Sequence, residues 1–139
     1  MENNKLIAYV SWGLALLAMV MSLFFSEVMK LPPCSLCWYQ RIFMYPLVFI
    51  IPIGILKNDN SVFTYCLALS LMGLVFSTYH TFIYHGIIPE TLKLCNSELS
   101  CKAKQFELFG FFSIPLMSTF CFLTIFILNL IGEKNAKRT

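Results

Sequence analysis

The chain has 139 residues, of which 58% are hydrophobic and only 12% are charged, and its mean hydropathy is +0.75. This balance is too apolar for a soluble domain of this size, so it predicts an integral membrane protein. The formal net charge is +3 and no basic stripe lies on a soluble face, so we expect no nucleic-acid partner.

Four long runs of the sequence lack Asp, Glu, Lys and Arg. A membrane-spanning helix needs about 20 apolar residues, so four spans use most of the chain and leave room for one longer loop, at about 84–109. We therefore predict an all-α fold, a four-helix membrane bundle that forms a single domain over residues 1–139. Its helices are expected at about residues 6–25, 38–56, 61–83 and 110–131.

The first span carries small residues on one face, which suits close helix packing: Ser11, Gly13, Ala15, Ala18 and Ser22. Its apolar core is longer than that of a signal peptide, and no small-x-small cleavage site follows before Glu27. We interpret this span as a retained helix.

The second span begins with a Cys-x-x-Cys pair, Cys34 and Cys37, directly after two prolines. Prolines stop a preceding helix, so a new helix begins at about this pair and places both thiols at its amino terminus. Unpaired backbone N–H groups and the helix dipole stabilise a thiolate there, which is the reactive form of cysteine. Arg41 follows Cys37 by four residues, so it shares a helix face with that sulfur and adds a positive charge.

Both features also have simpler interpretations. A Cys-x-x-Cys pair can be half of a zinc site, but zinc normally takes four ligands and no second cluster completes the set, so we predict no metal. Arg41 can be an interfacial anchor whose stem lies in hydrocarbon. An ionisable group at the bilayer centre costs about 2.5–3.5 kcal/mol, however, which favours a functional role. Two further cysteines, Cys66 and Cys121, lie in apolar helices and are expected to act as small hydrophobic residues.

An even number of spans places both termini on one side of the membrane. Their positive charges lie in very short segments, so we expect the termini in the cytoplasm. The pair Cys34/Cys37 and the loop pair Cys95/Cys101 then face the outside, where disulfides persist. Alone, Cys95/Cys101 could be a structural disulfide of its loop, but two pairs on one face permit thiol–disulfide exchange.

Energetics limit the direction of this exchange. Ordinary structural disulfides are too reducing, by about 8 kcal/mol for two electrons, to oxidise a strongly oxidising thiol partner. The exchange therefore needs strained pairs or a terminal acceptor. A lipid-soluble two-electron acceptor fits a membrane-level thiolate at Cys37 beside the cation Arg41.

These motifs resemble those of a known family. Cys34-Ser-Leu-Cys37 followed by Arg41 resembles the Cys-x-x-Cys-x-x-x-Arg signature of the DsbB family of quinone-dependent disulfide-forming membrane proteins. Tyr79-His80-Thr81 resembles its His-Thr segment, and the stretch from Cys101 to Gly110, with Pro115, resembles its entry into the fourth helix. The similarity covers nearly the whole chain in order, and the compact second loop is most similar to the Gram-positive BdbC type.

The resemblance implies a membrane enzyme that reoxidises a thioredoxin-like, DsbA-type extracytoplasmic thiol oxidase. The electrons would pass to a membrane quinone, either menaquinone or ubiquinone. Cys34 and Cys37 would form the quinone-facing pair, with Cys37 as the thiolate next to the quinone. Arg41 would bind the quinone and His80 would lie near it, although an interfacial histidine is an alternative for His80.

By the same resemblance, Cys95 and Cys101 would be the partner-facing pair, with Cys95 as the site of the mixed disulfide. Their spacing is shorter than in DsbB itself, which bears on how far the two pairs move to exchange. Two alternatives stay open. A vitamin K epoxide reductase-like relay places its Cys-x-x-Cys late in the chain, whereas Cys34 is early; a non-catalytic metal-binding membrane protein would be revealed by thiol titration with and without chelator.

Overall fold

The computed structural model describes residues 2–30, 33–87, 107–108 and 112–138. Four long helices make up almost all of this part of the chain: α1 (Glu2–Glu27), α2 (Ser35–Lys57), α3 (Val62–Tyr84) and α4 (Ile114–Arg138). Each is long and apolar enough to cross a membrane. The predicted all-α, four-helix membrane bundle is confirmed.

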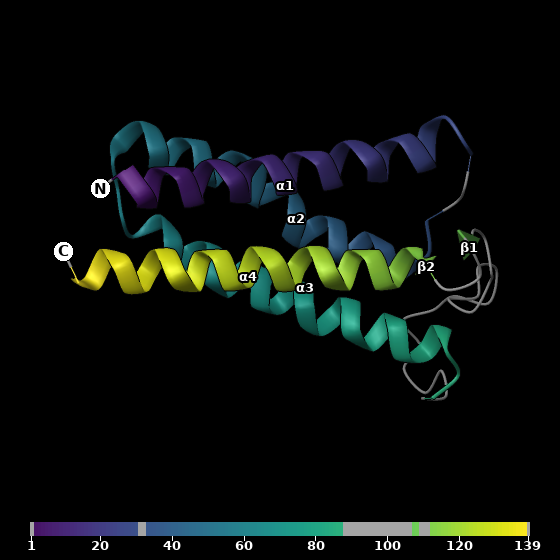
Figure 1. The fold of residues 1–139 in the computed structure, drawn as a ribbon. Helices are drawn as coiled ribbons and strands as arrows, with labels where there is room; N and C mark the ends of the chain where they lie inside the picture. The colour runs from purple at the N-terminus through teal and green to yellow at the C-terminus, as the bar shows by residue number, and fades with distance from the viewer. Residues whose placement is uncertain (1, 31–32, 88–106, 109–111, 139) are drawn as a thin grey trace.

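The helices pack in a closed ring. Contacts join α1 to α2, α2 to α3, α3 to α4, and α4 back to α1 (Figure 1). The carboxyl end of α1, the start of α2, the end of α3 and the start of α4 therefore lie at one end of the bundle. The chain ends and the α2–α3 turn lie at the other. This alternation brings the Cys-x-x-Cys motif and the end of α3 together.

A short hairpin precedes α4. Strands β1 (Glu107–Leu108) and β2 (Phe112–Ser113) pair antiparallel, with Glu107 opposite Ser113. Because β2 runs directly into Ile114, α4 begins a turn later than the predicted residue 110. Pro115 then falls in the first turn, where the missing N–H costs nothing. At its other end α4 extends beyond residue 131, where an i,i+4 ion pair joins Lys137 Nζ to Glu133 Oε1 at 2.7 Å.

Glycines bring α3 and α4 close together. A Cβ atom at Gly73 would overlap the Phe122 ring, and one at Gly132 would overlap the Phe63 ring. Both rings are buried. Small residues that admit neighbouring side chains in this way are typical of packed membrane helices. On α1, Ser11 and Ala15 are buried as the small-residue face predicts, whereas Gly13 is exposed.

Two prolines interrupt the hydrogen bonds inside α2, Pro46 and Pro52. Pro52 has no N–H for the carbonyl of Val48, four residues earlier. The indole Nε1 of Trp12 on α1 donates to that carbonyl at 3.0 Å. A neighbouring helix thus satisfies a backbone acceptor that would otherwise be unpaired in hydrocarbon.

We expect Trp12→Phe to destabilise the bundle by about 1–2 kcal/mol, because it leaves the Val48 carbonyl without its donor. The measurement is unfolding by SDS in mixed micelles, followed by circular dichroism. Tyr9→Phe is the matched control, since Tyr9 lies exposed on the same helix and loses a polar group of similar size. Equal stability of the two variants would show that the Trp12 hydrogen bond contributes little.

Candidate redox site

The two motif cysteines lie at the amino end of α2, as the sequence predicts. Cys34 is the N-cap residue, with extended backbone (φ −69°, ψ 167°), and its carbonyl accepts a 3.2 Å hydrogen bond from the N–H of Trp38. Both cysteines are free thiols, and Cys37 Sγ lies 3.2 Å from Cys34 Sγ. One turn of helix thus holds the two sulfurs within reach of each other.

Electrostatics at Cys34 favour the thiolate. The hydrogen bond with the Cys37 thiol is the largest effect that lowers the pKa of Cys34, burial opposes it, and the hydrogen bond with His80 lowers the pKa further. The net direction is well below the ordinary pKa of a cysteine. Hydrogen bonds from Cys37 and His80 therefore favour the thiolate form of Cys34, which lies at the helix amino terminus.

His80 reaches this pair from the last turns of α3. Its ring is 2% exposed, and Nε2 lies 3.6 Å from Cys34 Sγ. The amide Nε2 of Gln40, on α2, lies 3.0 Å from the other ring nitrogen, Nδ1. The hydroxyl of Ser118, on α4, donates to Gln40 Oε1 at 2.8 Å. Side chains of three helices therefore form one hydrogen-bonded network that ends at the Cys34 sulfur.

Gln40 and Ser118 were absent from the sequence-based predictions. A weak signal was present for Gln40, an amide in a charge-free run three residues after Cys37. Ser118 stands in an apolar helix whose other hydroxyl residues, Thr119 and Thr124, bond to their own backbone, and Thr119 also pairs with Thr81 on α3. The hydrogen bond from Ser118 to the Gln40 side chain on α2 is visible only in the folded bundle.

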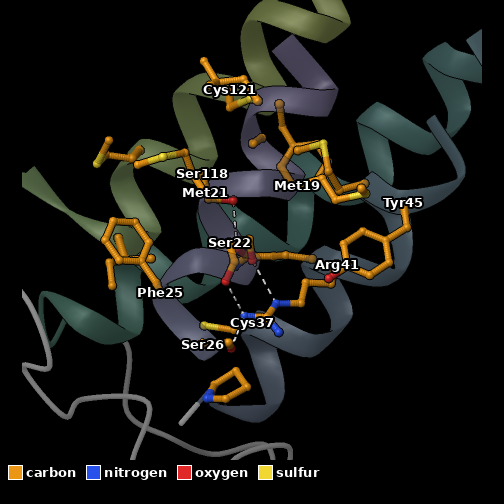
Figure 2. Close-up of a pocket in the computed structure, with 18 of the residues that line it drawn as sticks. Met19, Met21, Ser22, Phe25, Ser26, Cys37, Arg41, Tyr45, Ser118 and Cys121 are labelled. Carbon is orange, nitrogen blue, oxygen red and sulfur yellow. Dashed lines mark hydrogen bonds between the residues drawn. The ribbon is translucent and has the colours of Figure 1, made fainter. Parts of the chain in front are cut away.

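An apolar cavity of about 280 Å³ lies between α1, α2 and α4 (Figure 2). Most of its lining consists of Leu, Met, Ala, Phe, Ile and Pro side chains. Its polar contributors include two serines of α1, three residues near the start of α2 and one serine of α4: Ser22, Ser26, Cys37, Gln40, Arg41 and Ser118. Cys37 lines the cavity, whereas Cys34 and His80 do not. The two sulfurs of the pair therefore face different surroundings.

Hydrogen bonds anchor the Arg41 side chain to α1. Its Nε donates to Ser22 Oγ at 2.9 Å, and Nη2 donates to the Ser22 carbonyl at 3.0 Å and to Ser26 Oγ at 2.7 Å (Figure 2). The guanidinium carbon also lies 5.6 Å from the centre of the Trp38 ring. Among the described residues nothing pairs with Nη1, so two N–H donors of the cation stay available.

The structure brings together three of the predicted site residues, since the ligand atoms of Cys34, Cys37 and His80 all lie within 4.8 Å of one another. These are three atoms, one short of the four that a closed zinc site uses, so the absence of metal stays a prediction. Cys95 and Cys101 lie outside the described residues, and their roles stay predictions. Cys66 is buried in the core, while Cys121 lines the cavity.

The fold and this site define a multi-pass membrane protein that holds a thiol pair between a buried histidine and an apolar cavity. The sequence model of the family described as "Disulfide bond formation protein DsbB" matches residues 4–132, so the chain belongs to the DsbB family. The predicted family is confirmed. Because the chain belongs to this family, it is a membrane thiol–disulfide oxidoreductase that acts in disulfide bond formation.

Named relatives agree with the family. The chain is 48% identical over 119 residues to "Probable disulfide formation protein C 2" of Bacillus cereus, covering 86% of this chain and 85% of that one. It is 46% identical over 121 residues to "Probable disulfide formation protein" of Oceanobacillus iheyensis, covering 86% and 83%. It is 39% identical over 137 residues to "Disulfide bond formation protein C" of Bacillus subtilis, covering 97% and 99%. No solved structure matches the chain.

Proposed function

We propose that this protein reoxidises a thioredoxin-like extracytoplasmic thiol oxidase and passes the electrons to a membrane quinone, menaquinone or ubiquinone. The observation that carries the proposal is that Cys37 and Arg41 line the same apolar cavity. One sulfur of the pair and a cation whose Nη1 has no partner among the described residues thereby meet at a site among apolar side chains. Bound quinone would supply the two-electron acceptor there.

The residues of the cavity fit such a group. Its volume of about 280 Å³ and its apolar lining suit a flat, lipid-soluble ring. Ser22 and Ser26 accept hydrogen bonds from Nε and Nη2 of Arg41, and these bonds hold the guanidinium in place. The N–H groups of Nη1 would then be the donors for a quinone oxygen.

The separate surroundings of the two sulfurs suggest the order of exchange. We propose that a loop thiolate, from Cys95 or Cys101, attacks the sulfur of Cys34. This step forms a disulfide between the loop cysteine and Cys34, breaks the Cys34–Cys37 bond, and leaves the electron pair on the Cys37 sulfur. Because Cys37 lines the cavity and Cys34 does not, the leaving thiolate is generated on the acceptor side.

On the partner side, the proposal assigns the first contact to the loop. The reduced oxidase would attack the Cys95–Cys101 disulfide, with Cys95 as the site of the mixed disulfide. The end of α3 and strand β1, which flank this segment, lie at the same end of the bundle as the start of α2 (Figure 1). With the termini in the cytoplasm, both pairs would face the outside of the cell membrane.

The test is a coupled assay with the purified protein, a reduced thioredoxin-like donor and a soluble quinone analogue. We expect quinone reduction, followed by absorbance, to match donor oxidation one for one, because each disulfide formed releases two electrons. Omitting the donor is the control for direct reduction of quinone by buffer thiols. Donor oxidation without quinone reduction would overturn the assignment of the acceptor while leaving the thiol exchange intact.

A further inference from the structure

Gln40 and Ser118 have no part in the exchange proposed above, yet both connect directly to it. Hydrogen bonds run from Ser118 Oγ to Gln40 Oε1 (2.8 Å), from Gln40 Nε2 to His80 Nδ1 (3.0 Å), and between His80 Nε2 and Cys34 Sγ (3.6 Å). Gln40 is 7% exposed and His80 is 2% exposed, so water is a poor substitute for either partner.

The direction of these hydrogen bonds determines where the imidazole carries its proton. The Ser118 hydroxyl donates to Gln40 Oε1, so the amide NH₂ group of Gln40 faces the imidazole. An amide NH₂ group only donates, and Nδ1 must therefore accept. A neutral imidazole with an unprotonated Nδ1 carries its single proton on Nε2, the nitrogen that faces Cys34.

We propose that Gln40 and Ser118 are positioning residues that hold His80 in the Nε2–H tautomer, so that this proton stabilises a thiolate on Cys34. With the opposite tautomer, the Nε2 lone pair would face the sulfur and repel a thiolate. Ser118 acts through Gln40, and Gln40 acts through His80. The hydrogen bond to a charged sulfur is the strong kind, about twice as strong as one between neutral groups.

This inference rests on the proposed order of exchange, which gives the Cys34 thiolate a defined task. When the second loop thiolate attacks the first loop sulfur, the loop disulfide re-forms and the bond to Cys34 breaks. The electron pair of that bond goes to the Cys34 sulfur. A donor at 3.6 Å makes Cys34 a better leaving group in this step.

The other ionisable groups near this pair do not replace His80. Cys37, on α2, shares a 3.2 Å hydrogen bond with Cys34, and it lines the cavity together with Arg41. Tyr79, on α3, packs against the cluster that contains Cys34, and its hydroxyl has no hydrogen-bond partner among the described residues. The described parts of α1 and α4 contribute serines and apolar side chains to the network and the cavity. His80 is thus the one described nitrogen donor that reaches the Cys34 sulfur.

The first measurement reads the tautomer directly. The chain has two histidines, so protein labelled with ¹⁵N-histidine gives a spectrum simple enough to assign, with His85→Gln identifying the exposed ring. For wild-type protein in detergent at neutral pH, we expect His80 to show a protonated Nε2 and an unprotonated Nδ1. A protonated Nδ1 at His80 would overturn the proposal.

The second measurement reads the Cys34 thiolate without any quinone. Reduced protein is labelled briefly with iodoacetamide from pH 4 to pH 10, and fragmentation of the tryptic peptide of residues 31–41 separates Cys34 from Cys37. Each profile is normalised to its own plateau, so differences in access cancel. We expect the midpoint for Cys34 to rise by about one pH unit in Gln40→Leu, and by about half a unit in Ser118→Ala.

Two controls separate positioning from general structural damage. Ser77→Ala removes the same atom from a buried serine three residues before His80, whose hydroxyl bonds only its own helix at Leu74, and it should leave the midpoint unchanged. In a His80→Leu background, Gln40→Leu should add no further shift, because its effect passes through the imidazole. Equal shifts in Ser118→Ala and Ser77→Ala, or additive shifts in the His80→Leu background, would refute the inference. Neither outcome depends on whether quinone is the acceptor.

Discussion

Cys37→Ser is expected to lower donor-dependent quinone reduction by more than about 1,000-fold, because a serine hydroxyl can neither form a disulfide with Cys34 nor deliver the two electrons of a dithiol to the quinone. The same variant should trap an exchange intermediate. Its remaining thiolate, Cys34, can still attack the loop disulfide, and without Cys37 only the loop thiol that this attack releases can reverse the product, so rapid alkylation of that thiol preserves it. Mass spectrometry of the non-reduced digest measures the trapped disulfide between Cys34 and Cys95 or Cys101.

The reciprocal variant tests the assignment of the two sulfurs. Cys34→Ser should lose activity to the same degree but accumulate much less of the trapped species, because Cys37 lines the cavity and Cys34 does not. Cys66→Ala is the control, since Cys66 is buried in the core, away from the cavity, and its loss should leave turnover intact. Trapping at Cys37 instead of Cys34 would reverse the proposed order of exchange.

Arg41→His is expected to raise the apparent KM for the quinone analogue by about 10- to 100-fold, the effect of losing a hydrogen bond from a charged group. The shorter imidazole cannot reach Ser22 and Ser26 together, and it offers no equivalent of the free Nη1 donors. Both disulfides should still form, because the Cys34–Cys37 distance does not depend on Arg41. Steady-state kinetics with varied quinone and a thiol count on the resting protein measure the two effects.

Ser26→Ala provides a matched comparison. It removes one anchor of the guanidinium and leaves the charge in place, so we expect a rise in KM of a few-fold, well below that of Arg41→His. If Arg41→His leaves the KM unchanged, Arg41 is a membrane anchor and the cavity binds its ligand without a cation. A change in kcat alone would instead assign Arg41 to the chemistry of Cys37.

Local features of the sequence were sufficient for the spans and for the start of α2. Hydropathy over about 20 residues is a property of consecutive side chains, and the prolines before Cys34 act on the adjacent backbone alone. For the same reason the relation between Cys37 and Arg41 was predictable, since a spacing of four residues places two side chains on one face of any helix. The hairpin before α4 escaped prediction because two-residue strands leave almost no periodic signal.

Contacts between helices depend on how each helix is rotated about its axis and how deeply it packs, and consecutive residues carry little information about either. The tertiary structure therefore decided that Cys34 lies beside His80 and that Cys37 lines the cavity. The hydrogen bond between Trp12 and Val48 joins residues that are 36 positions apart in the sequence, and the one between Ser118 and Gln40 joins residues that are 78 positions apart. By itself the sequence determined a four-span membrane protein with a thiol pair at one helix start. Packing alone gave the two sulfurs different neighbours, because the ring of helices places a histidine on one side of the pair and an apolar cavity on the other.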